Sequence, residues 1–311
     1  REGEIDYMKR DLFSLALVVA AIVFFCQTIL WTGASPFRGD IPLQFYPWKC
    51  YTQQMLSEGE IPYWNPYTYG GAPFLANMQS AVFYPFDLIL FFFPMEWFFG
   101  LSLLIHLLLA GIGAFMLARI CGASSFPALI AGIAYGLNGF TMIHIPAGNH
   151  LTYAGAAWVP WLLWVTVGFV TSKQSRLPWA LGGSLIVFLH FLCGHPQMMF
   201  YSLVFSFLSC LILGLWIEKS KEKPNFAVPM IRTSAWSLFL LLGIALAGMQ
   251  LLPTVQYFFE ANRASSLDLQ MATEFSFAPH RLITLFCPEF YGTMLRGTHY
   301  EIGRASCRER V

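Results

Sequence analysis

The sequence contains few charged residues. Only 11% of its 311 residues are Asp, Glu, Lys or Arg, whereas 57% are hydrophobic and the mean hydropathy is +0.57. A soluble globular domain carries roughly 25% charged residues, so this chain lacks the polar surface needed to face water on all sides. The net charge of +1 and the absence of a basic patch interleaved with aromatics argue against a nucleic-acid partner.

Several apolar runs are long enough to cross a bilayer, and one secretory signal peptide does not explain them all. A spanning helix needs about 20 apolar residues. We predict an all-α, polytopic transmembrane bundle with spans at about 12–32, 98–118, 126–145, 151–170, 178–194, 197–217 and 233–254. The apolar stretch 80–94 contains Pro85 and Asp87 and ends at Pro94, so we expect it to be re-entrant or interfacial.

The basic residues favour one orientation of these spans. Of the Lys and Arg residues up to position 300, ten fall in the segments between spans on the side of the N-terminus and only five on the other side. Cytoplasmic segments are enriched in Lys and Arg. We therefore predict a cytoplasmic N-terminus, with the long loop at about 33–97 and the segment after about 255 outside.

Carboxylates are absent between Trp97 and Ile217, so acid–base chemistry must come from the loops. Asp40 is the earliest outside carboxylate and lies among apolar neighbours. We expect desolvation to raise its pKa and suit it to act as a base. The alternative is that Asp40 caps a helix that begins near Leu43. Glu58 and Glu60 flank Gly59 in a polar turn and are predicted to be solvated surface.

Four of the seven histidines form two pairs by position. His106 and His190 lie inside predicted spans, where hydrogen bonding to a neighbouring helix is the usual role. His150 and His195 lie at predicted outer span ends, where contact with phosphate or a metal and interfacial hydrogen bonding are equally good accounts. Without an H-E-x-x-H or D-x-D motif, the sequence gives little support to a metal site.

The long first loop carries the most specific pattern in the chain. It contains Gly39-Asp40-x-x-x-Gln44-x-x-Pro47-Trp48, Gly59-x-x-Pro62-x-Trp64-Asn65-Pro66-Tyr67 and Gly71-x-Pro73-x-x-Ala76-Asn77-x-Gln79-Ser80. Later runs are Phe83-Tyr84-Pro85, Trp158-x-Pro160-Trp161, Gly194-His195-Pro196-Gln197 and Gln250-Leu251-Leu252-Pro253, followed by Arg263. Together these motifs resemble the YfhO-like bacterial integral membrane proteins, over essentially Met8 to Tyr300.

The resemblance implies a glycosyltransferase of the GT-C architecture in the bacterial cytoplasmic membrane. Such enzymes transfer a sugar from a polyprenyl-phosphate-linked donor to a saccharide, envelope-polymer or glycolipid acceptor at the outer face. An aspartate early in the first outside loop is their usual catalytic residue, and Asp40 has that position. The paired acidic motif that binds metal in some relatives is missing, so the need for a divalent metal stays open.

The resemblance also distributes roles among the remaining residues. Arg38 and Arg263 are the expected donors to the lipid phosphate, with His150 and His195 as helpers. Trp64 and Tyr67 are expected to stack on sugar or isoprenoid faces. Three further motif residues complete the predicted substrate-binding set, Gln44, Asn65 and Gln197. One cavity that opens sideways toward lipid is expected to collect the residues near the outer ends of spans: Asp40, Trp64, Asn65, His150, His195 and Arg263.

Two other classes of function stay open at this point. A transporter or flippase for lipid-linked saccharides would more often carry ionisable residues at mid-membrane and inverted repeats, whereas this sequence has no carboxylate in five successive predicted spans and no obvious repeat. A non-catalytic scaffold for envelope assembly is the third hypothesis.

Both ends of the chain look foreign to the protein. The codons that residues 301–311 allow resemble a sequencing adapter, and Met8 is a natural start that would make residues 1–7 upstream read-through. We therefore expect residues 1–300 to be the N-terminal part of a longer transmembrane domain, and residues 301–311 to be artefactual.

Overall fold

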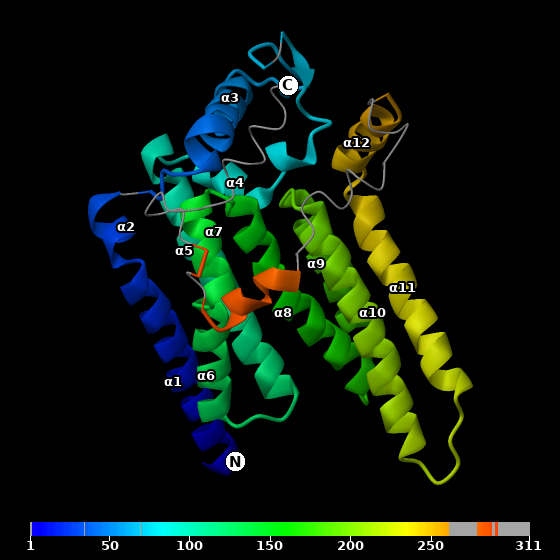
Figure 1. Ribbon diagram of the computed structural model, residues 1–311. Helices are drawn as coiled ribbons and strands as arrows, with labels where there is room; N and C mark the ends of the chain where they lie inside the picture. The colour runs from blue at the N-terminus through cyan, green and yellow to red at the C-terminus, as the bar shows by residue number, and fades with distance from the viewer. Residues whose placement is uncertain (1, 34, 69, 261–278, 288–289, 292–311) are drawn as a thin grey trace. The chain divides into compact units, whose positions relative to one another are not determined.

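The computed structural model describes residues 2–33, 35–68, 70–260, 279–287 and 290–291, in two units, Arg1–Tyr257 and Phe258–Val311. The first unit is an α-helical bundle, which confirms the predicted class (Figure 1). Its only sheet in the described residues is one antiparallel hairpin, β1 (Trp64–Asn65) with β2 (Ala72–Pro73). The described part of the second unit contains a short 3-10 helix at Pro279–Leu285 and a hydrogen bond from Tyr291 to the His280 carbonyl.

Most of the first unit consists of long helices. They are α1 (Glu2–Phe25), α5 (Met95–Ile120), α6 (Ser125–Gly136), α7 (Gly139–Ala147), α8 (His150–Thr171), α9 (Leu177–Leu192), α10 (Pro196–Lys219) and α11 (Ala227–Leu246). Between or after them lie α2 (Gln27–Thr32), α3 (Tyr46–Ser57), α4 (Pro85–Leu90) and α12 (Gly248–Glu260).

Five segments among the described residues are long and apolar enough to cross a membrane: α5, α6 with α7, α8, α10 and α11. They match five of the seven predicted spans. The predicted span 12–32 is divided at Cys26 between α1 and α2, and α9 has only 16 residues. The last span begins and ends earlier than predicted, at Ala227–Leu246, because a new helix starts at Gly248.

The segment 80–94 does not span, as expected. It contains α4, whose 6 residues extend only about 9 Å, far less than a hydrocarbon core of about 30 Å. The first loop is more regular than its prolines indicate, because it contains the 12-residue helix α3. Pro47 lies in the first turn of α3, where a proline needs no backbone hydrogen-bond donor.

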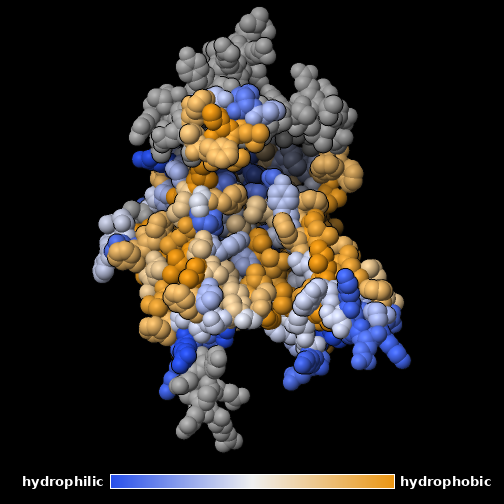
Figure 2. Space-filling model, turned by 60° about the horizontal axis from the view of Figure 1, so that its bottom comes forward, coloured by the Kyte–Doolittle hydropathy of each residue, from blue (hydrophilic) through white to orange (hydrophobic). Residues whose placement is uncertain are grey.

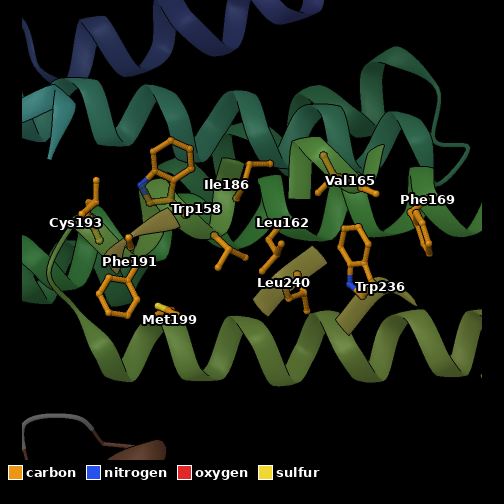
Figure 3. Close-up of a cluster of buried hydrophobic side chains, with 14 of the residues drawn as sticks. Trp158, Leu162, Val165, Phe169, Ile186, Phe191, Cys193, Met199, Trp236 and Leu240 are labelled. Carbon is orange, nitrogen blue, oxygen red and sulfur yellow. The ribbon is translucent and has the colours of Figure 1, made fainter. Parts of the chain in front are cut away.

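Helix α8 lies at the centre of the bundle, in contact with α5, α9 and α10 (Figure 1). Its run of small residues Ala154–Ala157 is buried, so neighbouring helices approach it closely. The largest apolar cluster joins α8 to α9, α10 and α11 (Figure 3), where Trp236 is fully buried against Phe169. Gly132 of α6 lies against Val18 of α1 and Gly111 of α5, so these three helices also approach closely.

The outer surfaces of the helices are apolar. Large hydrophobic side chains of α10 and α11 are exposed, among them Phe205, Ile212, Leu238 and Leu241. Figure 2 shows hydrophobic side chains over most of the visible face, with hydrophilic ones at the helix ends that come forward. A surface of this kind fits a lipid bilayer.

Candidate functional site

The segment that carries Asp40 lies directly against the turn between α7 and α8. Gly39 and Gly148 make this contact, with φ of +58° and +77°, values that glycine adopts most readily. A Cβ on Gly39 would lie 1.9 Å from the carbonyl oxygen of Ala147, and one on Gly148 would lie 2.4 Å from the backbone nitrogen of Asp40. The first loop and the α7–α8 turn therefore meet backbone to backbone.

Asp40 itself is exposed and precedes a π-helical turn, Ile41–Phe45, that continues into α3. Its position is the N-cap of that turn, yet its side chain makes no capping hydrogen bond. This contradicts the capping alternative. The expected desolvation of Asp40 is also wrong, because Ile41 and Phe45 point into the core while Asp40 faces outward.

Two further loops meet the Asp40 segment at the same end of the bundle. The Gln44 side-chain amide donates to Gln79 Oε1 at 3.2 Å. A Cβ on Gly194 would lie 2.6 Å from the Met78 carbonyl oxygen, so the α9–α10 turn lies against the loop that contains Gln79. The motifs around residues 40, 79 and 194 are thus brought together, although 154 positions separate the first from the last.

His195 is the helix cap of α10. Its Nδ1 accepts a hydrogen bond from the backbone N–H of Met198 at 3.1 Å, which leaves Nε2 to donate to Thr152 Oγ1 at 3.0 Å. Desolvation lowers the pKa of His195, and the positive charge of nearby His144 lowers it further. These two contacts are the hydrogen bonding that was one of the two predicted accounts of His195.

His150 is buried beneath the loop, with 2% of its surface exposed. Its ring makes edge contacts with Phe45 and Phe99, at centroid distances of 4.3 and 5.2 Å. Neither ring nitrogen has a hydrogen-bond partner among the described residues. His190 in α9 is likewise unpartnered there, so the expected hydrogen bond to a neighbouring helix is wrong for His190.

Sequence reasoning missed a buried ion pair under the first loop. Lys49 Nζ lies 2.6 Å from Asp87 Oδ2 and donates to the Ser80 carbonyl at 2.8 Å. The two side chains are 1% and 3% exposed. A charge buried at this depth needs a partner. The sequence signal was the single Asp in an apolar, proline-flanked stretch, 38 residues after the only Lys of the loop.

A chain of hydrogen bonds runs deeper into the bundle beside this pair. Trp158 Nε1 donates to the Tyr84 hydroxyl at 3.1 Å, and that hydroxyl donates to His106 Nε2 at 2.8 Å. His106 Nδ1 in turn donates to the Ser102 carbonyl at 2.6 Å. His106 is hydrogen-bonded, as expected, but its partners are Tyr84 of the loop and Ser102 of its own helix, and not a neighbouring spanning helix. Its burial raises the pKa of Tyr84 well above the usual value.

The β1–β2 hairpin holds the predicted aromatic residues. Trp64 and Tyr67 are exposed, whereas Asn65 is buried and its Oδ1 accepts from the Tyr67 backbone N–H at 2.9 Å. Asn65 therefore shapes the turn. Tyr51 of α3 anchors the hairpin by donating to the Trp64 carbonyl at 2.6 Å.

The remaining predicted residues are more dispersed. Arg38 is exposed beside Asp40, and its carbonyl oxygen accepts from the Ile41 N–H at 3.2 Å. Gln197 is exposed in the first turn of α10 and donates to the Tyr201 hydroxyl at 2.8 Å. Arg263 and the tail 301–311 lie outside the described residues.

An apolar groove of about 630 Å³ opens between α6, α7, α8 and α10. It is lined by Ala131, Ala134, Tyr135, Asn138, Phe140, Ala156 and Met198, none of them a predicted site residue. A hollow of about 260 Å³ shares Ala131 and Tyr135 with it and continues toward α5. Because the backbone N–H of Met198 bonds to His195, one end of the groove lies beside the loops around residues 40, 79 and 194.

Within the described residues, no group of three or more His, Cys, Asp or Glu side chains is arranged to hold a metal ion. Comparison of the chain with protein-family models, with curated proteins and with solved structures finds no match.

Proposed function

We propose that this protein is a membrane glycosyltransferase of the GT-C type. It takes a sugar from a polyprenyl-phosphate-linked donor and transfers it to a cell-envelope polymer or glycolipid. In this proposal the protein resides in the bacterial cytoplasmic membrane, α1 and α9 complete seven spans, and the N-terminus is cytoplasmic. The first loop then faces outward, and the reaction takes place at the extracytoplasmic face.

The observation that carries the proposal is the placement of Asp40. Its carboxylate is exposed, it makes no capping bond, and its backbone is fixed against the α7–α8 turn. A carboxylate held in position yet free to accept a proton supports the role of a general base, which must come within hydrogen-bond reach of the acceptor hydroxyl. Of the other exposed carboxylates of the loop, Glu58 and Glu60 flank Gly59, where nothing lies within 4 Å of an added Cβ, and Glu96 lies in the first turn of α5.

The proposed transfer uses one carboxylate. Asp40 removes the proton of an acceptor hydroxyl while that oxygen attacks the anomeric carbon. The bond from this carbon to the phosphate oxygen breaks, and the lipid phosphate departs with the electron pair. Unlike glycoside hydrolysis, this reaction needs no acid to protonate the leaving oxygen. Arg38 is placed to stabilise the phosphate charge.

The apolar groove supports a lipid-linked donor. It combines an apolar wall with an end beside His195 and Thr152, close to the polar loops. An isoprenoid chain lying in this groove would keep its phosphate at the level of those loops.

The test is the variant Asp40→Asn in the intact enzyme. Because Asp40 makes no capping bond, the variant should insert and unfold like the original protein. Loss of a general base should lower the rate of transfer from a polyprenyl-phosphate donor by about 10²–10⁴-fold. The matched control is Glu96→Gln, an exposed carboxylate near the start of α5, which should transfer normally. Near-normal transfer by Asp40→Asn would refute the assignment.

The second candidate is a transporter or flippase for lipid-linked saccharides. The buried Lys49–Asp87 pair and the chain from Trp158 to His106 favour it, since buried ionisable groups often mark transport pathways. Reconstituted vesicles separate the two functions. Movement of a labelled lipid-linked sugar across the bilayer without any acceptor, and unchanged in Asp40→Asn, would favour the transporter.

A further inference from the structure

The β1–β2 hairpin presents a rigid aromatic surface. Trp64 is 53% exposed and Tyr67 81% exposed. A Cβ on Gly71 would lie 2.5 Å from Trp64 Cζ2 and 2.7 Å from Nε1, so glycine allows the indole edge to rest on the backbone. Tyr51 packs edge-on against Tyr67 at 5.9 Å and against Phe74 at 5.3 Å. The exposed rings are therefore held in fixed positions.

We propose that this surface binds a chain of uncharged or amino-bearing sugars several rings long. Its role as the acceptor site rests on the proposed function, whereas the binding itself does not. A pyranose ring has a face of C–H groups that stacks on a fixed aromatic ring, and a rim of hydroxyls that hydrogen-bonds to carboxylates and amides. Trp64 and Tyr67 offer the rings, and Glu58 and Glu60 offer the carboxylates.

The negative charge of the loop near the hairpin favours uncharged or amino-bearing sugar polymers over anionic ones. Glu58 and Glu60 are exposed, and their charges reach Tyr51: its pKa is raised by desolvation first, and then by Tyr67 and these two carboxylates. The sequence contains no Lys or Arg between Lys49 and Arg119, and Lys49 is buried in its ion pair. Among the described residues of α3 and the hairpin, an anionic polymer would meet two carboxylates and no exposed Lys or Arg.

Insertion of the hairpin into lipid is the competing role of exposed Trp and Tyr. Two observations oppose it. Glu58 and Glu60, whose charges reach Tyr51 under the hairpin, would be costly to bury in a bilayer. The hairpin also lies beside the far part of α3, away from the long helices (Figure 1).

The distance to Asp40 sets the length of the ligand. The helical stretch from Asp40 to Tyr51, which anchors the hairpin, is roughly 16 Å long. A single sugar bound at Trp64 does not reach Asp40, whereas a chain of several rings extends from one to the other. The hairpin thus favours a polymeric acceptor over a small glycolipid.

Binding is measured on the intact protein in lipid nanodiscs by calorimetric titration with cellohexaose, a hexamer of glucosamine and an oligogalacturonate of equal length. The first two should bind, and the anionic oligomer should not. Trp64→Ala should weaken binding of cellohexaose about tenfold, Trp64→Phe should retain most of it, and Tyr63→Ala, the adjacent exposed tyrosine, should change it little. Loss of folding is monitored by thermal unfolding, and Trp64→Phe keeps the test valid where Trp64→Ala unfolds.

Other results would overturn the proposal: equal binding by Trp64→Ala, equal binding of the oligogalacturonate, or equally tight binding of glucose. A nitroxide at Tyr67→Cys that is reached by oxygen but not by a water-soluble nickel chelate would place the hairpin in lipid instead. If binding holds while Asp40→Asn also transfers sugar normally, the proposed catalytic role fails and the saccharide site stands.

Discussion

Lys49 and Asp87 form a deeply buried ion pair in the described part of the protein. Two opposite charges are removed from water almost completely, and only one further hydrogen bond, to the Ser80 carbonyl, supports them. Burying a charge is costly, and the attraction between the partners mainly offsets that cost. The pair is therefore a poor source of net stability but a strong restraint on which surfaces meet.

Removing one partner of this ion pair should make the cost of burying the remaining charge measurable as a loss of stability. Asp87→Asn leaves the Lys49 ammonium buried without a counter-charge, so we expect the free energy of unfolding to fall by about 3–5 kcal/mol. Denaturant titration in detergent, followed by circular dichroism, measures the change. The double variant Lys49→Met/Asp87→Leu removes both charges and should be clearly more stable than Asp87→Asn. Equal destabilisation of the two would show that packing, and not the charge, is responsible.

At the scale of helices and loops, contacts with distant parts of the chain determine the conformation of the first loop. Gly39 and Gly148 let the loop touch the α7–α8 turn, and Gly194 does the same for the α9–α10 turn. Each contact leaves no room for a Cβ. The position of Asp40 thus depends on two glycines that are 109 positions apart.

Gly39→Ala should disturb this arrangement more than a matched change elsewhere. The added Cβ meets the Ala147 carbonyl oxygen at 1.9 Å, so the loop must move away from the turn. Gly59→Ala is the control: Gly59 also has a positive φ, +77°, but nothing lies within 4 Å of its Cβ position. We expect Gly59→Ala to cost only about 1–2 kcal/mol and Gly39→Ala to cost more, together with a greater loss of transfer. Equal effects in both assays would mean that the contact does not position Asp40.

At the scale of the whole molecule, the exposed apolar helices fit a bilayer, and the orientation in that bilayer is a prediction from charge. Ser57 is the last residue of α3 in the first loop, and Ser220 follows α10; both are exposed. In a variant whose exposed cysteines are replaced by serine, a membrane-impermeant thiol reagent added outside should label Ser57→Cys and spare Ser220→Cys. Labelling of Ser220→Cys alone would reverse the proposed topology.

The helical class, five of the spans and the short segment at 80–94 followed from the sequence alone. The length of an apolar run and the position of a proline are local properties of the sequence. They decide directly whether a segment can cross a bilayer as a helix. Helix breaks were harder to predict. Between α6 and α7, Asn138 accepts a hydrogen bond from the Thr141 N–H and starts a new helix inside a continuous apolar run.

The candidate site, like the fold, could be predicted from the sequence only in part. The sequence placed Asp40, His150 and His195 at one end of the bundle, because all three lie next to span ends. Only the tertiary structure decided that Asp40 is exposed, that His150 is buried and that Asp87 pairs with Lys49. Burial and pairing depend on which distant segments meet, here residues 39 with 148 and 49 with 87. Neither partner's local sequence carries that information.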